Sequence, residues 1–214
     1  MALTRPFDEH PDRYDEWFDA HRFVYRSELE AIAHLVPEAG LGIEIGVGSG
    51  RFAVPLSIGL GVEPSRPMGE RAAARGVRVV AAVAEQLPFA SESFDFALLV
   101  TTICFLDDAK AAFGEVTRVL KPGGAVIIGY VDRDSSLGRR YQRHKLANAF
   151  YRDATFYSTD EALSLLSETG FNVTETVQTV FGELSEIAAV QGFSPGSGDG
   201  GFVVVCARKP NARS

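Results

Sequence analysis

Between residues 41 and 131, short apolar runs alternate with longer amphipathic stretches. The apolar runs have the continuity of strands buried on both faces, and apolar positions at three- and four-residue steps between them predict helices. The expected strands are 41–45, 58–63, 77–83, 93–100 and 125–131; the expected helices begin at Phe52, at the N-cap Ser65 (65–75) and at residue 107 (107–120). This alternation predicts right-handed crossovers and an α/β fold with a doubly wound parallel sheet.

Residues 11–36 carry a single amphipathic stripe, which predicts one helix with at most one break before Pro37. The front of the stripe is aromatic and polar, with Tyr14, Trp17 and His21, whereas its back is aliphatic. Two interpretations stay open. The aromatic side chains either pack in the core, as most such residues do, or cover a ligand site.

The pattern changes after residue 131. Residues 132–152 predict a helical insert that is strongly basic within an acidic chain, either a solvated helix face or a lid that brings positive charge to an anionic substrate. A helix is expected at 158–168, and two strands at 171–181 and 202–207 are joined by a long flexible connection. We expect one domain over 1–214, divided into a helical cap (1–40), a cofactor-binding core (41–131), the insert (132–157) and a C-terminal helix and hairpin (158–214).

Composition narrows the functional classes. A chain of 214 residues, 46% of them hydrophobic, suffices for one well-buried domain, and a net charge of −7 argues against a non-specific nucleic-acid binder. No apolar run approaches the roughly 20 residues of a membrane span, and the N-terminus has no signal-peptide core. Cys104 and Cys206 lie in apolar runs and form no metal-type cluster, which indicates reduced core residues in a cytoplasmic protein.

The candidate chemistry begins where the first strand ends. Gly46, Gly48 and Gly50 follow that strand at once, and a turn without side chains lets a ligand approach the backbone closely. If a helix follows directly, its first N–H groups are free to bind the ligand. Glu63 ends the second strand about 20 residues further on, where dinucleotide-type folds place an acid on the ribose hydroxyls. The sequence therefore predicts a nucleotide-type site.

Five motifs in order resemble the class I S-adenosylmethionine-dependent methyltransferases. They are Glu44-Ile-Gly46-Val-Gly48-Ser-Gly50, Val62-Glu63-Pro64, Ala84-Glu85-Gln86-Leu87-Pro88-Phe89, Phe94-Asp95-Phe96-Ala97 and Leu120-Lys121-Pro122-Gly123-Gly124. The resemblance implies a Rossmann-like, seven-stranded sheet in the order 3-2-1-4-5-7-6, with the last strand antiparallel and helices on both faces. It also implies S-adenosylmethionine as the cofactor and methyl transfer as the activity.

The resemblance further implies how the cofactor is held. Glu44 and the backbone from Gly46 to Gly50 would bind its methionine part, and Glu63 would accept both ribose hydroxyls, which requires two acceptor oxygens. Pro64 and Thr101, which follow the second and fourth strands, are expected beside the same ligand.

The adenine end of the site departs from the family at one position. By the resemblance, Met68 and Leu87 flank the adenine ring. Val83 stands where the family often has an aspartate that contacts the adenine amino group. Adenine recognition then rests on the Ala84 backbone and on apolar packing, with a smaller part for Glu85.

The acceptor end carries fewer signals. Transfer of a methyl group from a sulfonium is an in-line displacement, so the protein mainly aligns the reactants and excludes water. We expect Trp17, Thr102 and Asp132 to bind a small-molecule acceptor, and Tyr14 and His21 are the candidates for catalysis. An aromatic ring near the sulfonium adds cation–π attraction, and histidine is the residue type that exchanges protons near neutral pH. No metal site, nucleic acid or membrane is expected to take part.

Three alternatives remain beside this hypothesis. An NAD(P)-dependent oxidoreductase would carry Gly-x-Gly-x-x-Gly, but Arg51 occupies its third glycine position. A domain that binds the cofactor without chemistry, as a regulator, would share the same motifs. Aminopropyl transfer from a decarboxylated cofactor would require an acid-rich polyamine pocket, and the basic insert argues against one.

Overall fold

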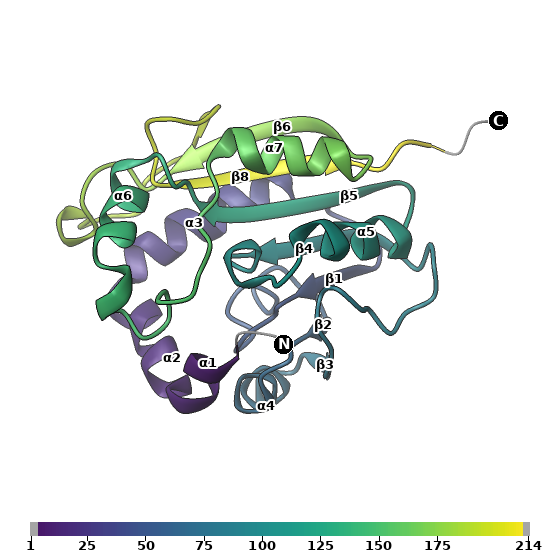
Figure 1. Cartoon of the computed structure of the whole chain (residues 1–214), viewed down its shortest axis with the longest axis horizontal. Coiled ribbons are helices and arrows are strands. Elements are labelled where there is room, and N and C mark those ends of the chain that lie inside the picture. The colour runs from purple at the N-terminus through teal and green to yellow at the C-terminus, as the bar shows by residue number, and fades with distance from the viewer. Residues whose placement is uncertain (1–3, 212–214) are drawn as a thin grey trace.

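The computed structural model describes residues 4–211. An eight-stranded sheet crosses the molecule in the order β3-β2-β1-β4-β5-β8-β6-β7 (Figure 1). Its strands are β1 (Gly42–Ile45), β2 (Leu60–Val62), β3 (Arg78–Val80), β4 (Phe94–Val100), β5 (Leu120–Val131), β6 (Asn172–Thr179), β7 (Ser194–Pro195) and β8 (Phe202–Arg208). The first five strands are parallel, and β8 is antiparallel to both of its neighbours, β5 and β6.

The strand order that the family resemblance implied is confirmed, with β8 inserted between β5 and β6. The extra strand β7 has two residues and pairs with the outer edge of β6, inside the connection that we expected to be flexible. Gln178 holds that connection against the sheet, because its buried Oε1 accepts hydrogen bonds from Asp199 N (2.8 Å) and Gly200 N (2.7 Å). One side chain thus ties the loop back to β6.

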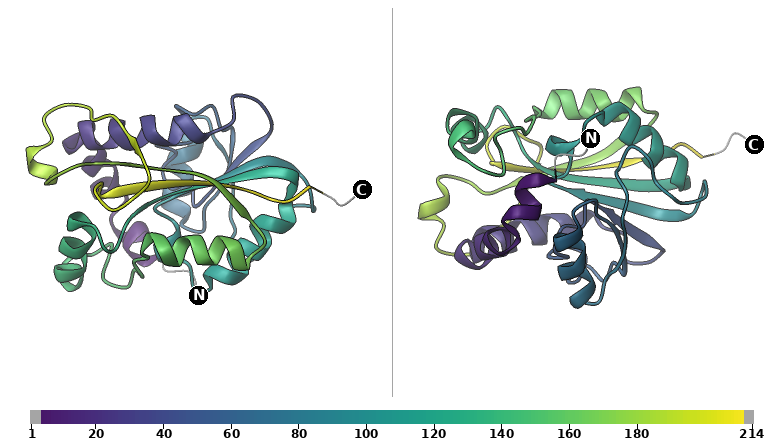
Figure 2. Two further views of the ribbon diagram at one scale, coloured as in Figure 1. Left: turned by 90° about the horizontal axis from the view of Figure 1, so that it is seen from above. Right: turned by 60° about the horizontal axis from the view of Figure 1, so that its bottom comes forward.

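Helices cover both faces of the sheet (Figure 2). They are α1 (Arg5–Glu9), α2 (Pro11–Ala20), α3 (Arg22–Leu35), α4 (Arg66–Ala74), α5 (Ala109–Val119), α6 (Ser136–Arg143) and α7 (Thr159–Glu168), with 3-10 turns η1 (Ile103–Phe105), η2 (Lys145–Ala147) and η3 (Leu184–Glu186). α3 packs on β5, β6 and β8, whereas α5 and α7 contact β5 and β6 from the opposite side. Within residues 4–211, none of the helices is both long and apolar enough to span a bilayer.

The two faces of the sheet form separate hydrophobic cores, as β4 illustrates. Ala97 and Leu99 belong to the core that contains α5 and α7. Phe96, Leu98 and Val100 point the other way and belong to the core that contains α3. Successive side chains of a strand alternate between faces, so an uninterrupted apolar run fits a strand that is covered on both sides.

The predicted helix at Phe52 is wrong. Residues 51–57 form consecutive turns, and the first helix after the glycine loop is α4. Pro55 explains the difference, because it lacks an N–H group and disfavours a helical conformation in the residue before it. The carbonyl oxygen of Arg51, which a helix would bond to residue 55, instead accepts a hydrogen bond from the Tyr25 hydroxyl at 2.5 Å.

The N-terminal stripe is broken once, as predicted, and the break lies at His21 (φ −113°, ψ 41°) between α2 and α3. The break shifts the register, so that the front of α3 buries Val24 and Glu28 more deeply than Tyr25. Of the predicted helical insert, only α6 and the short turn η2 are helical; the remainder up to residue 157 consists of turns and extended chain.

Candidate active site

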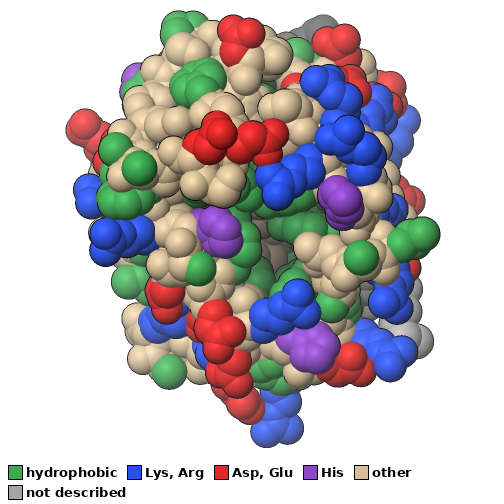
Figure 3. All heavy atoms as spheres, turned by 90° about the vertical axis from the view of Figure 1, so that its left-hand side faces the viewer, with side chains coloured by type: hydrophobic (Ala, Val, Ile, Leu, Met, Phe, Trp, Pro, Cys, Tyr) green, Lys and Arg blue, Asp and Glu red, His purple; other side chains and the backbone are tan. Residues whose placement is uncertain are grey.

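A cavity of about 490 Å³ lies beyond the carboxyl ends of β1, β2, β4 and β5. Residues that follow these strands form one side, and α1, α2 and residues 137–151 supply most of the other. On the face shown in Figure 3, a hollow with hydrophobic side chains on its floor opens among basic, acidic and histidine side chains. The site therefore lies where ligands bind in open parallel sheets, at the carboxyl ends of the strands.

The glycine loop after β1 has a conformation that favours glycine. The φ angles of Gly46, Gly48 and Gly50 are 73°, 54° and 84°. A Cβ on Gly46 would lie 2.5 Å from Thr102 Oγ1, and one on Gly48 would lie 3.2 Å from the Tyr14 hydroxyl. Gly46 and Gly48 line the cavity, so backbone is exposed there to a ligand; Gly50 is buried behind them.

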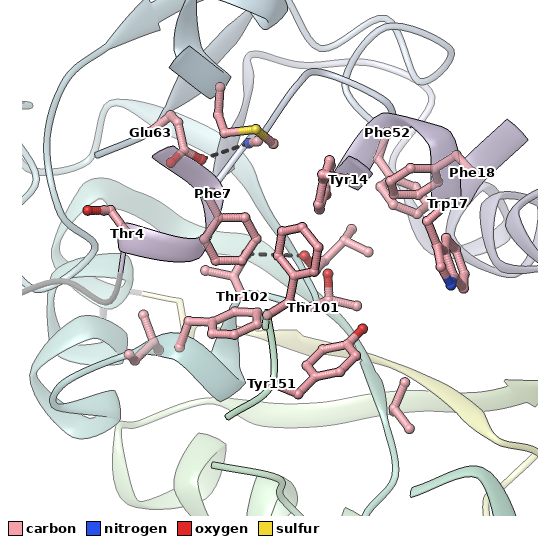
Figure 4. Close-up of a pocket in the computed structure, with 18 of the residues that line it drawn as sticks. Thr4, Phe7, Tyr14, Trp17, Phe18, Phe52, Glu63, Thr101, Thr102 and Tyr151 are labelled. Atoms are coloured by element: carbon pink, nitrogen blue, oxygen red, sulfur yellow. Dashed lines mark hydrogen bonds between the residues drawn. The ribbon is translucent and has the colours of Figure 1, made fainter. Parts of the chain in front are cut away.

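Glu63 is held rigidly at the end of β2. Its Oε2 accepts a hydrogen bond from Gly48 N and its Oε1 one from Ser65 N, both at 2.8 Å (Figure 4 labels this carboxylate). Burial raises the pKa of Glu63, and these two N–H groups oppose the shift. Each oxygen keeps a further lone pair for a ligand. Ser65 is the N-cap residue of α4, as expected, but its hydroxyl donates to Asp8 Oδ1 (2.7 Å) and makes no hydrogen bond to the helix backbone.

Glu44 lies behind the glycine loop, with 1% of its surface exposed. It does not line the cavity, and its Oε2 has no hydrogen-bond partner within the described part of the chain. Burial raises the pKa of Glu44 well above its ordinary value, against a hydrogen bond from the Ala53 backbone. An unpaired buried oxygen is costly, so this atom is an acceptor available to a ligand group that reaches the loop.

The strand ends also place the predicted adenine-side residues. Met68, Pro64 and Ala84 line the cavity, and Met68 is almost fully buried. Leu87 does not line it but packs in the core on the α5 side. Glu85 also lines the cavity. Its carboxylate accepts hydrogen bonds from the backbone N–H groups of residues 107 and 108, which fixes the loop to the start of α5.

Two threonines follow β4 at the floor of the cavity. Thr101 has φ 51°, a strained conformation for a β-branched residue, and its N–H donates to Gly129 O at 2.7 Å. Thr102 donates its hydroxyl to Ile45 O (3.1 Å) and Val100 O (3.2 Å), which joins the ends of β1 and β4. Both residues line the cavity, as expected, although the Thr102 hydroxyl is already engaged.

The N-terminal helices bring Tyr14 and Trp17 into the cavity lining. Figure 4 shows both rings on the side opposite Glu63, with Phe7 between. His21 does not line the cavity. Its ring stacks on Trp17 at a centroid distance of 4.8 Å, and its Nδ1 lies 3.0 Å from Trp17 O, so the geometry gives no support to a catalytic role for His21.

Asp15 fixes α2 to the glycine loop. Its carboxylate accepts hydrogen bonds from Ser49 Oγ (2.7 Å), Arg51 Nε (2.9 Å), Arg71 Nη1 (3.0 Å) and Arg75 Nη2 (2.9 Å). Burial alone would raise the pKa of Asp15, but these donors outweigh it and hold the pKa well below its ordinary value. The fit between helical cap and loop thus depends on one buried carboxylate.

The insert contributes aromatic rings to the cavity. Phe150, Tyr141 and Tyr151 line it, and the two tyrosine rings stack at 5.0 Å. Of its arginines, Arg140 also lines the cavity but pairs with the Glu183 carboxylate. The expectation of a positively charged lid is therefore not met by the lining, which contains two arginines and four glutamates, namely Arg13, Arg140, Glu16, Glu28, Glu63 and Glu85.

Asp132, expected to bind substrate, does not line the cavity. Its Oδ2 accepts a hydrogen bond from Thr159 Oγ1 and its Oδ1 one from Asp134 N, both at 3.0 Å. Tyr130 reaches the same threonine through its hydroxyl at 3.2 Å. Asp132 therefore joins the end of β5 to the start of α7, and the geometry gives no support to a role in substrate binding.

Glu28 on α3 was missed by the sequence analysis. It lines the cavity with 5% of its surface exposed, and its carboxyl group has no hydrogen bond or ion pair with any residue from 4 to 211. Burial raises the pKa of Glu28 to about 8. The available signal was its spacing: Glu28 lies four residues from both Val24 and Ile32, on the apolar face of the helix.

Known proteins resemble this chain over nearly its whole length. A family model described as a methyltransferase domain matches residues 43–128. A crystal structure from Thermotoga maritima, described as an SAM-dependent methyltransferase and "possible histamine N-methyltransferase", is 49% identical, covers 97% of this chain and 100% of its own, and has a TM-score of 0.95. An uncharacterized protein of Methanocaldococcus jannaschii is 44% identical over 95% of this chain and 98% of its own length.

A more distant relative is named O-methyltransferase, from Pyrenophora dematioidea, and is 30% identical over 71% of this chain and 62% of its own length. Fold, motifs and relatives agree: the chain belongs to the S-adenosylmethionine-dependent methyltransferases. It is an enzyme of that class, its cofactor is S-adenosylmethionine, and the predicted family is confirmed in preference to the NAD(P)-dependent oxidoreductases.

Proposed function

We propose that this methyltransferase acts on a small molecule that is enclosed in the cavity beside the cofactor. The supporting observation is that the chain's own helices and insert line the cavity, whose volume of about 490 Å³ lies within the range of small-ligand sites. The cavity has two parts. The cofactor end comprises the residues at the strand ends, and the acceptor wall comprises the lining residues of α1, α2, α3 and 137–151.

The cofactor end fits S-adenosylmethionine on three observations. Gly46 and Gly48 line the cavity without side chains while their N–H groups donate to Val62 O and Glu63 Oε2, the Glu63 carboxylate is held in place with free lone pairs, and Glu44 Oε2, behind the loop, is a buried acceptor without a partner in the described chain. We assign the methionine part to Glu44 and the glycine loop, and the ribose hydroxyls to Glu63. The residues proposed beside the rest of the cofactor are Pro64, Met68, Ala84, Glu85 and Thr101.

When bound, the cofactor supplies a methyl group on a positively charged sulfur. The chain's task is then to orient the acceptor for in-line displacement and to exclude water. Tyr14 fits this position, because it lies against Gly48 and presents an aromatic ring that attracts a nearby cation. Trp17 and the threonines Thr101 and Thr102 border the remaining space.

The proposal is tested by calorimetric titration with S-adenosylhomocysteine, with NADH as a parallel control. We expect micromolar binding of S-adenosylhomocysteine and none of NADH. With S-adenosylhomocysteine bound, limited proteolysis should cut the acceptor wall more slowly than in the free protein, because the wall closes over the ligand. Absence of binding, or equal cleavage of residues 5–35 and 137–151 in both states, would contradict the proposal.

We also infer a cytoplasmic setting, supported by two buried cysteines that form no disulfide.

A further inference from the structure

We propose that Glu28 is the acceptor-binding carboxylate of this enzyme, and that it pairs with the ammonium group of a small amine and holds that group's proton. The inference rests on the proposed function, since it concerns the ligand of the same cavity. It names both the chemical class of the acceptor and the side chain that recognises it.

The first argument is the isolation of Glu28. The buried acids Asp15, Glu63 and Asp132 accept hydrogen bonds from defined donors, and Glu44, although its Oε2 is unpaired, accepts one from the Ala53 backbone. Glu28 lies on the apolar face of α3 and has no such donor among residues 4–211, yet its surface faces the cavity. A buried carboxyl group without a partner destabilises a fold, so its natural explanation is a ligand that supplies the partner.

The second argument is the aromatic surroundings of the acceptor wall, which suit a cationic nitrogen. Seven rings line this part of the cavity, those of Phe7, Tyr14, Trp17, Phe18, Tyr141, Phe150 and Tyr151. Electron-rich ring faces attract ammonium groups, most strongly when water is excluded. The Glu28 carboxylate adds to the burial that raises the pKa of Tyr14, Tyr141 and Tyr151, which shows that these phenols lie within electrostatic reach of it.

The third argument is the balance of charge around the cavity. Its lining contains two arginines against four glutamates, and the guanidinium of Arg140 pairs with Glu183. The other lining arginine, Arg13, is exposed and lies over the Phe150 ring at 5.9 Å. An anionic acceptor would therefore meet no unpaired, buried cation among the described residues, whereas an ammonium group would meet Glu28.

The proton inventory follows from this pairing. An alkylammonium group has a pKa of about 10.4, and free Glu28, with a pKa of about 8, is mostly protonated at neutral pH. Formation of the pair therefore releases one proton to solvent, and the remaining proton is shared by the amine nitrogen and Glu28. When Glu28 holds it, the nitrogen lone pair is free to form the N–C bond as the S–C bond breaks. The electron pair of the S–C bond stays on sulfur, and the positive charge passes to nitrogen.

The test compares 2-phenylethylamine and a panel of short alkylamines with their neutral alcohol analogues, titrated into the protein saturated with S-adenosylhomocysteine. We expect amines to bind and alcohols to bind at least tenfold more weakly. Amine affinity should rise about tenfold per pH unit up to about pH 7 and level off above pH 8, because one proton is released until Glu28 is already ionised in the free protein. Within the described chain, the groups that face Glu28 are the phenols of Tyr14, Tyr25, Tyr141 and Tyr151 and the guanidinium of Arg140. None of these phenols titrates in this pH range, since burial raises the pKa of each, and the arginine stays charged.

The decisive variant is Glu28→Gln, which keeps the shape and removes the carboxylate. It should lose at least tenfold in amine affinity and lose the selectivity over alcohols, while its affinity for S-adenosylhomocysteine stays unchanged. Glu28→Asp should recover part of the amine affinity. Glu30→Gln is the matched control, because Glu30 lies on the same helix but is exposed and does not line the cavity, and it should bind amines like the unmodified protein.

Three results would overturn the inference: equal binding of amines and alcohols, full amine affinity in Glu28→Gln, or no binding by any amine of the panel. Each leaves the proposed function standing if S-adenosylhomocysteine still binds. Loss of S-adenosylhomocysteine binding by the unmodified protein would instead remove the proposed function itself.

Discussion

The two sides of the cavity are built differently. At the cofactor end, the ligand-facing groups are backbone atoms and carboxylates whose positions are fixed by neighbouring N–H groups, as for Gly48 and Glu63. The acceptor wall is built from side chains of α1, α2, α3 and residues 137–151, and seven of its lining residues are aromatic. A site made of backbone tolerates little change in sequence, whereas a wall made of side chains changes its ligand by substitution.

The same contrast separates two buried acids on adjacent helices. Asp15 on α2 has four donors, three of them from arginines, and its pKa is lowered; Glu28 on α3 has none within the described residues, and its pKa is raised. The first arrangement stabilises the contact between the helical cap and the glycine loop. The second leaves a group that is ready to bind a ligand.

The largest expected effect falls on the cofactor end. Glu63→Ala should weaken S-adenosylhomocysteine binding about 100-fold or more, because each hydrogen bond to a charged group contributes roughly 1.5–3 kcal/mol. Calorimetric titration measures the loss, and Glu70→Ala, an exposed acid on α4, serves as the control. An affinity close to that of the unmodified protein would show that the ribose does not bind at Glu63.

The next largest effect is on protein stability, through Asp15, which joins the helical cap to the glycine loop. Asp15→Asn should destabilise the protein by about 2–3 kcal/mol at pH 7, at the lower end for a broken buried ion pair because its arginine partners are partly exposed. Since the pKa of Asp15 is lowered in the folded protein, its stabilisation is present above pH 4 and is lost as the pH falls further.

Urea unfolding at pH 7 and at pH 3 checks this prediction. The difference between Asp15→Asn and the unmodified protein should shrink at the lower pH. Asp12→Asn should have a much smaller effect, because Asp12 pairs with Arg71 on the exposed surface. An equal loss for the two variants would mean that the buried network adds nothing to stability.

Glu28→Gln should have a somewhat smaller effect, of opposite sign. Because burial raises the pKa of Glu28 to about 8, the folded state is penalised as the pH rises from about 4.3 to 8, and the variant lacks this penalty. Full linkage for this rise gives roughly 5 kcal/mol at pH 8, which is discounted because the carboxyl group faces a cavity that opens to solvent, so we expect Glu28→Gln to be more stable by about 2 kcal/mol at pH 8 and nearly equal at pH 4. Thermal unfolding of the free protein measures this, with the exposed Glu30→Gln as control; a variant less stable at pH 8 would show that the carboxylate has a partner.

The sequence predicts the two regions unequally. The alternation of strands and helices and the position of Glu63 at the end of the second strand follow from apolar runs and glycines, because local backbone geometry determines them, whereas the strand order was implied by the family resemblance. The sequence does not reveal the effect of Pro55 on the turn after the glycine loop, nor the change of helical register at His21 that brings Glu28 into the cavity. Such features depend on how separate segments pack, and a stripe of apolar positions does not encode this alone.

The smallest expected effect concerns His21, one of the two residues that the sequence offered as candidates for catalysis. His21 stacks on Trp17 outside the cavity lining, so His21→Ala should remove only a partly exposed aromatic contact, worth less than about 1 kcal/mol. S-adenosylhomocysteine and amine affinities should stay within about twofold, a change below 0.5 kcal/mol. Trp17→Ala, which changes the lining itself, should weaken amine binding clearly more. If both variants lost amine binding equally, the break between α2 and α3 would itself be part of the acceptor wall, because His21 would then act through the helix geometry that places Trp17 and Glu28.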